Sequence, residues 1–292
     1  MQVGVVFPQT ESGTDVGAIR EFAQTIEAMG YRHILVYDHV MGATRERLGH
    51  LPWAPYDSES PFHEVFVFLS YVAAITQQLR LVTGVLVLPQ RETALVAKQA
   101  AALDVLSGGR LDLGVGVGWN DVEYEALQAN FHNRGLRQAE QVRVLRELWT
   151  QPVVEFEGRY HHLHGVGIRP LPVQQPIPVW FGGNSEASYQ RAARLGDGFM
   201  PNVSGLSRLE ALRPTLAAMR EAVRASGRDP ARFGLWPRLN LKDTAEVRAG
   251  TLAFWRSEGA THLSVNTLGM GVQGLEAHLR ALEAARHEVG LA

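Results

Sequence analysis

Short apolar runs rich in β-branched residues alternate along the chain with longer stretches in which apolar residues recur every three or four positions. The first pair is typical, with an apolar run over residues 3–8 followed by a segment of helical spacing. The apolar face of that segment consists of Ile19, Phe22, Ile26 and Met29. Asp15 is the expected N-cap of this helix and Gly30 its expected end. Strand and helix patterns in alternation are typical of βαβ units, which build a parallel sheet.

Eight strand patterns can be followed along the sequence, each succeeded by a helical pattern. They cover residues 3–8, 33–38, 79–89, 107–118, 178–183, 197–201, 233–241 and 261–266. Eight strand–helix units in 292 residues match a (β/α)₈ TIM barrel better than an open doubly wound sheet. A doubly wound sheet would require a nucleotide fingerprint after the first strand, and FPQTESG is not one. We therefore expect an α/β fold with a single TIM-barrel domain over residues 1–292.

Two segments depart from the alternating pattern, and we expect each to be an insertion into the barrel. Residues 41–62, after the second strand, form an irregular stretch with glycine and proline that is long enough to cover a pocket. Residues 153–176, after the fourth strand, have the pattern of a hairpin-like excursion closed by prolines.

Composition and charge exclude several classes of function. The chain contains no cysteine, so disulfides, a thiolate nucleophile and cysteine-ligated zinc or iron–sulfur clusters are ruled out. A formal net charge of -2 with both signs interspersed leaves no basic stripe for nucleic acid. No run approaches the roughly 18 apolar residues of a membrane helix, and the first residues lack the basic region of a signal peptide. We expect a cytoplasmic protein with a small-molecule substrate and without nucleic acid or membrane as a partner.

The active site of a barrel lies at the carboxyl ends of the strands, so the residues after each strand are the candidates. His39 follows the second strand, beside Asp38, and its type titrates near neutrality, which suits proton transfer in a pocket. A buried structural histidine would give the same local pattern. The fourth strand ends in LGVGVGWN, whose alternate glycines either admit a ligand or relieve crowding inside the barrel.

The fifth strand ends in Gly182, Gly183, Asn184 and Ser185, a sequence suited to binding phosphate. Two glycines let the backbone approach a ligand, and the helix that follows offers free N–H groups and the positive end of its dipole. The alternative is an ordinary strand-to-helix turn in which Asn184 or Ser185 caps the helix.

Several histidines and tryptophans have a structural explanation as well as a functional one. His161, His162 and His164 resemble a metal cluster, but a hairpin places His162 and His164 on one face and His161 on the other. We therefore expect no metal site. Trp53 and Trp119 either line an aromatic ligand or fill the core, and the sequence alone favours the core.

Five blocks of sequence together resemble the bacterial luciferase-like superfamily, and within it the deazaflavin (coenzyme F420)-dependent oxidoreductases. The blocks are YDHV, TGVLVLP, AKQAAALDVLSGGRLDLGVGVGWNDVEYEAL, PVWFGGNS and ARLGDGFMP, and the resemblance spans nearly the whole chain. It implies a barrel that holds a flavin or deazaflavin at its carboxyl end and exchanges a hydride or, with flavin, activates oxygen. It also implies a homodimer formed through barrel helices.

The resemblance assigns roles to particular residues. Asp38 and His39 match a pair beside the reactive ring, with His39 as the proton donor or acceptor. Val85 and Leu86 fall where related members have a non-proline cis peptide that backs the ring. The remaining matches to the cofactor site are Gly116, Gly118, Trp119 and Asn120 along the cofactor, and Gly182, Gly183 and Asn184 at its phosphate.

One departure from the superfamily concerns the substrate. Sugar-phosphate dehydrogenases of the superfamily have a carboxylate where this chain has Trp119, so the resemblance does not extend to their substrate. An aromatic residue at this position favours an apolar or planar substrate. Residues 41–62, with Trp53 and Tyr56, are expected to form part of a lid that shapes specificity.

Three functions remain open from the sequence. The first is an F420-dependent oxidoreductase in which His39 handles the proton that accompanies hydride transfer. The second is an FMN-dependent luciferase-like monooxygenase that uses reduced flavin and O₂, and the third is a barrel that binds cofactor without turnover. The first two functions would use the same site residues. They differ in what the cofactor's anionic end requires, because the longer acidic tail of the deazaflavin favours extra basic groups near the mouth.

Overall fold

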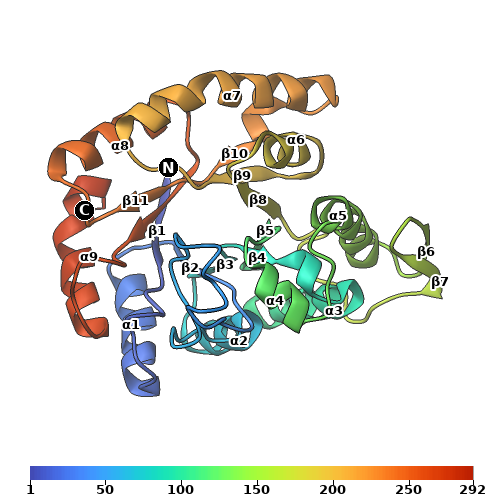
Figure 1. Cartoon of the computed structure of the whole chain (residues 1–292), viewed down its shortest axis with the longest axis horizontal. Helices are drawn as coiled ribbons and strands as arrows, with labels where there is room; N and C mark the ends of the chain where they lie inside the picture. Colours follow the sequence, from blue (N-terminus) through green and yellow to red (C-terminus); the bar gives the residue numbers. More distant parts are fainter. Residues whose placement is uncertain (292) are drawn as a thin grey trace.

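The computed structural model describes residues 1–291 and has the α/β architecture expected from the sequence, with parallel strands inside a ring of helices (Figure 1). The neighbouring strands of the main sheet are in the order β10-β9-β8-β5-β3-β2-β1-β12-β11, with β4 paired to β5. Their bounds are β1 (Gln2–Val6), β2 (His33–Val36), β3 (Arg80–Thr83), β4 (Leu86–Val87), β5 (Leu111–Gly116), β8 (Val179–Gly183), β9 (Gly198–Pro201), β10 (Gly234–Leu235), β11 (Arg238–Asn240) and β12 (His262–Asn266).

One continuous stretch of chain joins the two ends of this sheet. β10 pairs with β9, whereas β11, only a few residues later, pairs with β12. Trp236 and Pro237 stand between them: the N–H of Trp236 donates to the carbonyl of Phe199, and the carbonyl of Pro237 accepts from Ser264. The single strand predicted over residues 233–241 is therefore wrong, because proline has no N–H with which to continue a ladder.

The strand predicted over residues 79–89 is also divided. β3 pairs with β2 and with the start of β5, whereas β4 pairs only with the end of β5. The two pieces are separated by a cis peptide bond between Gly84 and Val85. The cis bond therefore lies one residue before the Val85–Leu86 position at which the resemblance placed it.

Helices cover the outside of the sheet (Figure 1). They are α1 (Val16–Ala28), α2 (Val65–Ile75), α3 (Thr93–Ser107), α4 (Asp121–Ala126), α5 (Arg134–Thr150), α6 (Glu186–Leu195), α7 (Leu206–Ala225), α8 (Ala245–Ser257) and α9 (Leu275–Val289). The first helix begins as predicted, since the Asp15 carboxylate accepts the N–H groups of Gly17 and Ala18 at 2.7 and 3.1 Å. Gly30, with φ of 88°, follows its end, as the sequence predicts.

The core has two parts, one between the sheet and the helices and a smaller one inside the barrel. The inner part consists of Val6, Leu35, Val82, Trp180, Met200 and Trp236. Buried polar groups lie beside it near the amino ends of the strands: His33 Nε2 is 2.8 Å from the Ser264 hydroxyl, and Trp180 donates to Asp112. Because side chains fill this end of the barrel, the carboxyl end is left for a ligand.

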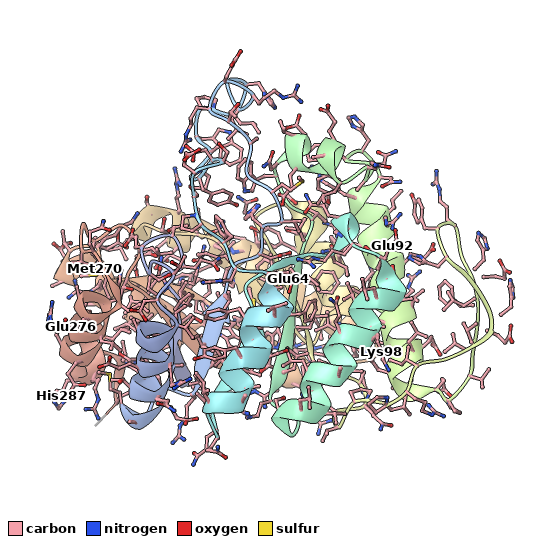
Figure 2. All side chains as sticks on the ribbon, turned by 90° about the horizontal axis from the view of Figure 1, so that it is seen from below. Glu64, Glu92, Lys98, Met270, Glu276 and His287 are labelled. Atoms are coloured by element: carbon pink, nitrogen blue, oxygen red, sulfur yellow. The ribbon has the colours of Figure 1, made fainter. Side chains whose placement is uncertain are left out.

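Two segments lie outside the parallel sheet. β6 (Val154–Glu157) and β7 (His162–Val166) pair only with each other, as an antiparallel hairpin at the edge of the molecule (Figure 1). The segment between β2 and α2 rises above the carboxyl end of the sheet, beside α4, in the view turned by 90° (Figure 2). This segment has a small core of its own, made of Ala43, Leu48 and Ala54 with Leu51, Trp119 and Val122 packed against it.

Candidate active site

Val85 forms the floor of the mouth at the carboxyl end of the barrel. A Cβ added to Gly116 would lie 2.4 Å from one methyl of Val85, and a Cβ added to Gly182 would lie 2.7 Å from the other. Gly118, with φ of 66°, meets Val87 in the same way at 2.7 Å. The glycines of LGVGVGWN and FGGNS therefore let β4 and the residue before it pack closely against β5 and β8, and Val85 stays partly exposed.

Asp38 anchors this floor from below. One carboxylate oxygen accepts the N–H of Val87 at 2.9 Å, and the other lies 2.7 Å from the guanidinium of Arg91, which also reaches Glu64 at 3.0 Å. The Asp38 side chain is 1% exposed. Asp38 thus holds β4 in position, and both of its carboxylate oxygens are already bonded to Val87 and Arg91.

His39 comes next in the chain and is held by Glu123 from α4. The Nδ1 atom of His39 lies 2.9 Å from Oε2 of Glu123, while Oε1 accepts the N–H groups of Val40 and Met41 at 2.7 and 3.2 Å. Burial raises the pKa of Glu123, but the hydrogen bond and charge of His39 and the two N–H groups outweigh it, so the pKa lies below its usual range. Glu123 is therefore an ionised carboxylate at neutral pH.

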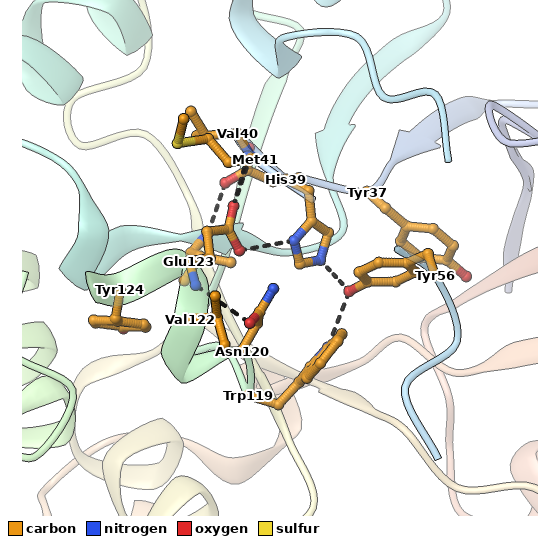
Figure 3. A network of polar contacts seen from close by, with 12 residues as sticks. Tyr37, His39, Val40, Met41, Tyr56, Trp119, Asn120, Val122, Glu123 and Tyr124 are labelled. Atoms are coloured by element: carbon orange, nitrogen blue, oxygen red, sulfur yellow. Dashed lines mark hydrogen bonds and ion pairs between the residues drawn. The ribbon is translucent and has the colours of Figure 1, made fainter. Parts of the chain in front are cut away.

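The other nitrogen of His39 faces the segment above the mouth. The Tyr56 hydroxyl contacts Nε2 of His39 and also accepts the indole N–H of Trp119 at 2.9 Å (Figure 3). Burial raises the pKa of Tyr56 above its usual value. A chain of polar contacts thus runs from Glu123 through His39 and Tyr56 to Trp119. It joins three segments that are far apart in the sequence.

Aromatic side chains enclose this chain of contacts. The ring of Phe62 lies 5.1 Å from that of His39 and 4.9 Å from that of Tyr56, and the ring of Trp53 lies 5.1 Å from that of Trp119. Trp53 is 60% exposed, and Trp119 is half-buried. The core interpretation is therefore wrong for Trp53, which is exposed, whereas Trp119 packs against the small core of Ala43, Leu48 and Ala54.

The segments predicted to bind the cofactor lie around the same mouth. Asn120 is buried and caps α4, its side chain accepting the N–H of Glu123 at 3.2 Å. Ser185 caps α6 in a reciprocal pair of hydrogen bonds with Ser188. A Cβ on Gly183 would lie 2.6 Å from the side chain of Ser188. Asn184 is exposed between the strand and the helix. The cap interpretation of Ser185 is confirmed, while binding of phosphate here stays a prediction.

Arg238 is a site residue that the sequence analysis missed. It begins β11, and its guanidinium donates to the Tyr37 hydroxyl at 2.6 Å and to the Asn202 side chain. Tyr37 follows β2 and Asn202 follows β9, so these contacts connect the ends of three strands. Within residues 1–291 Arg238 has no carboxylate partner, which leaves a positive charge at the mouth. Arg238 lies inside the strand predicted over residues 233–241, and this place gave no indication of such contacts.

Of the three histidines near the hairpin, two share a partner and the third faces elsewhere. His162 and His164 both pair with Glu157, as expected for residues on one face, whereas His161 lies 2.8 Å from Glu140 of α5. Within residues 1–291, no group of three or more histidine and carboxylate side chains has the arrangement of a metal site. No helix in this range is long and apolar enough to cross a membrane.

Comparison with known proteins places this site in a family. An uncharacterised protein of Mycobacterium tuberculosis is 34% identical over 220 residues, which are 74% of this chain and 75% of that protein. An F420-dependent glucose-6-phosphate dehydrogenase of Kineococcus radiotolerans is 30% identical over 82% of this chain and 68% of its own length. An FMNH₂-dependent dimethylsulfone monooxygenase of Pseudomonas fluorescens is 28% identical over 86% of this chain and 65% of its own length.

Solved structures share the fold. A monooxygenase from Streptomyces bottropensis superposes with a TM-score of 0.79 at 22% identity, covering 100% of this chain and 99% of its own. An F420-dependent secondary alcohol dehydrogenase superposes with a TM-score of 0.78 at 18% identity, covering 99% and 98%. The sequence profile of the luciferase-like monooxygenases matches residues 1–289. The chain belongs to the luciferase-like monooxygenase family, whose members are F420- or flavin-dependent oxidoreductases and monooxygenases.

Proposed function

We propose that this protein is an F420-dependent oxidoreductase that transfers a hydride between F420 and a small organic substrate. The observation that carries the proposal is His39, held through Nδ1 by the ionised Glu123 at the edge of the mouth. Such a pair can take up and release the proton that accompanies hydride transfer, because the carboxylate stabilises the imidazolium that forms.

The residues at the mouth fit a planar cofactor with an anionic side chain. Val85, flanked by Gly116 and Gly182, offers an apolar side chain against which a ring can lie. Arg238 places a positive charge at the same mouth, beside the Tyr37 hydroxyl. When bound, F420 would supply the carbon that accepts or donates the hydride, a chemistry that no side chain provides.

The substrate of this reaction would be small and largely apolar or planar. Trp53, Phe62 and Trp119 line the space above His39 with aromatic surface. No carboxylate stands at position 119, where sugar-phosphate dehydrogenases of the superfamily have one. A relative named for glucose-6-phosphate thus supports the cofactor more than the substrate.

The second candidate is an FMN-dependent monooxygenase that uses reduced flavin and O₂. It is favoured by the dimethylsulfone monooxygenase, whose 28% identity over 255 residues is close to the 30% over 245 residues of the F420-dependent relative. The aromatic enclosure would suit it too, since exclusion of water protects a reactive flavin. Arg238, as an extra positive charge near the mouth, is what favours the deazaflavin.

A parallel titration of the purified protein with F420 and FMN, each oxidised and reduced, distinguishes these candidates by fluorescence. We expect F420 to bind in the micromolar range or more tightly and FMN to bind more weakly. Preferential binding of reduced FMN would assign the protein to the monooxygenases. Binding of neither cofactor would contradict both, and binding of F420 without turnover of any substrate would leave a cofactor-binding barrel.

The homodimer and the cytoplasmic location implied earlier stay predictions. Light scattering of the purified protein at micromolar concentration tests the first. A mass of twice 32.2 kDa would support it, and a mass of 32.2 kDa would overturn it.

A further inference from the structure

We propose that the Tyr56 hydroxyl is the group that exchanges the proton with the substrate oxygen, and that His39 and Glu123 form a relay behind it. This inference rests on the proposed hydride transfer and names a catalytic residue and a substrate class for it. The substrate would be a small alcohol in one direction and the corresponding carbonyl compound in the other, because the group that exchanges the proton is an oxygen.

The contacts of His39 leave it no free nitrogen for a substrate. Nδ1 faces Glu123 at 2.9 Å, Nε2 is covered by the Tyr56 hydroxyl, and the side chain is only 8% exposed. Tyr56 itself is half-buried and belongs to the segment above the mouth. In this arrangement a substrate oxygen reaches the proton of His39 only through the oxygen of Tyr56.

The donors and acceptors along the chain of contacts fix the position of each proton. Ionised Glu123 can only accept, so Nδ1 of His39 must carry a hydrogen. The Trp119 indole can only donate, so the Tyr56 oxygen accepts from it. When His39 is neutral, its Nε2 therefore has a lone pair, and the single proton of Tyr56 points to it.

Protonation of His39 reverses the direction of the hydrogen bond between its Nε2 and the Tyr56 oxygen. Nε2–H then donates to the Tyr56 oxygen, which already accepts from Trp119, so the proton of Tyr56 must turn to a third acceptor. The acceptor available in the mouth is the oxygen of a bound substrate. Tyr56 thus presents an acidic hydrogen to the substrate when His39 is charged and an acceptor oxygen when its own proton has passed to His39.

The reaction balances with this relay. In the oxidising direction the alcohol carbon would lose a hydride to oxidised F420, which would supply the two-electron acceptor. The alcohol O–H proton would pass to the Tyr56 oxygen and the proton of Tyr56 to Nε2 of His39. The C–H and O–H bonds of the alcohol would break, a carbonyl would form, and His39 would become an imidazolium beside Glu123. Reduction of the carbonyl compound would run through the same steps in reverse.

The charged and titratable groups around Tyr56 keep its hydroxyl protonated at neutral pH. Glu123 lies on α4, while Asp38 and Tyr37 follow β2, and all three raise the pKa of Tyr56, as does burial, which has the largest effect. The hydrogen bond from Trp119 acts the other way. Tyr56 therefore stays protonated at neutral pH until a base takes its proton, and the neighbouring Nε2 is that base.

Substitution of Tyr56 by phenylalanine tests the proposal, because it keeps the ring and removes the hydroxyl. Tyr71→Phe is the matched control, since the Tyr71 hydroxyl contacts Arg20 on the outer face of the helices. At saturating F420 we expect Tyr56→Phe to lower kcat about 100-fold or more, the usual range for a lost acid–base group, with the Kd for F420 unchanged. Tyr71→Phe should match the wild type.

A second readout needs no cofactor. With ¹⁵N-labelled histidine, the neutral ring of His39 in the wild-type protein should be the tautomer with hydrogen on Nδ1, and Tyr56→Phe should shift its Nε2 resonance toward that of a free lone pair. A neutral ring with hydrogen on Nε2 in the wild type would overturn the proposal. So would a Tyr56→Phe variant that keeps its kcat within about threefold of wild type, since Tyr56 would then merely cover His39.

The failures of the two proposals can be told apart. If the wild type transfers no hydride to or from F420, the proposed function fails, whereas the tautomer of His39 still reports on its contact with Tyr56. If Tyr56→Phe does not fold, Trp119→Phe replaces it, because loss of the indole N–H leaves the Tyr56 oxygen without its second donor. We expect that variant to slow turnover about 100-fold, and an unchanged rate would overturn the proposal.

Discussion

Oε2 of Glu123 lies 2.9 Å from Nδ1 of His39, and the other oxygen of the same carboxylate holds the backbone N–H groups of the next two residues, Val40 and Met41. One side chain from α4 thus fixes both the ring of His39 and the start of the segment that covers the mouth. Asn120 in turn caps the helix that carries Glu123. The carboxyl ends of β2 and β5 are joined through this one buried carboxylate.

Glu123→Gln should therefore reduce both stability and turnover. The glutamine keeps the size of the side chain but loses the charge, so the contacts with His39, Val40 and Met41 weaken, and we expect unfolding to become easier by about 1–3 kcal/mol. Urea denaturation measures the loss. Glu125→Gln is the control, because Glu125 is 73% exposed and pairs with Arg47 only at the surface; an equal loss in both variants would contradict the assigned role.

The contribution of Glu123 to stability should also depend on pH. Its pKa in the folded protein is lower than in the unfolded chain, so the folded state binds fewer protons. The stabilisation is then fully present above the unfolded value near 4.5 and is lost as the pH falls through the folded value. Denaturation of wild type and Glu123→Gln between pH 7 and pH 3 tests this, and a constant difference between them over that range would refute it.

His262 should add a second acid-sensitive contribution at higher pH. Its ring stacks on Trp236 at 4.1 Å, and burial together with the charge of Arg80 lowers its pKa to about 4. The unfolded chain therefore binds a proton first, so the stabilisation is present above pH 6.5 and falls away as the pH drops toward 4, by at most about 3 kcal/mol.

A His262→Asn variant checks this expectation. Thermal unfolding of the variant should depend less on pH between 6.5 and 4 than that of wild type. His164→Asn, at an exposed position on the hairpin, should leave the wild-type slope unchanged. Equal slopes for wild type and His262→Asn would show that His262 titrates alike in the folded and unfolded chain.

The close packing of β5 against β3 predicts a large effect at Gly114. A Cβ at this position would lie 2.0 Å from the backbone carbonyl oxygen of Thr83, which cannot move without breaking the sheet. We expect Gly114→Ala to destabilise the fold by about 3 kcal/mol. Gly17→Ala is the control, because its Cβ would meet only the Asp15 carboxylate at 3.1 Å in the first turn of α1; similar melting temperatures for the two variants would contradict this packing.

Local sequence patterns sufficed to predict the strands and helices of the barrel and the position of His39 after the second strand. Alternating strand and helix periodicity is set by residues near one another in sequence, as in α1 with its Asp15 cap. The divisions within residues 79–89 and 233–241 were not predicted, because the pairing of β4 and of β10 depends on which neighbouring strands are within reach.

The partners of His39 were beyond sequence reasoning for a similar reason. Glu123 lies 84 positions away in the chain, and Tyr56 belongs to an irregular segment whose path no periodicity reports. Glu123 had one local signal, its place three residues after the capping Asn120 in GWNDVE. Arg238 had none beyond the strand that it begins, because its contacts with Tyr37 and Asn202 come from the closure of the barrel.

We propose above that His39 handles the proton in an F420-dependent hydride transfer. The most direct test is the rate of F420 reduction by a panel of small alcohols, with wild type and His39→Ala both saturated with cofactor. We expect wild type to reduce F420 with at least one alcohol, and His39→Ala to lower the rate by about 10²–10⁴ while the Kd for F420 is unchanged. A folded His39→Ala protein that reduces F420 as fast as wild type would contradict it.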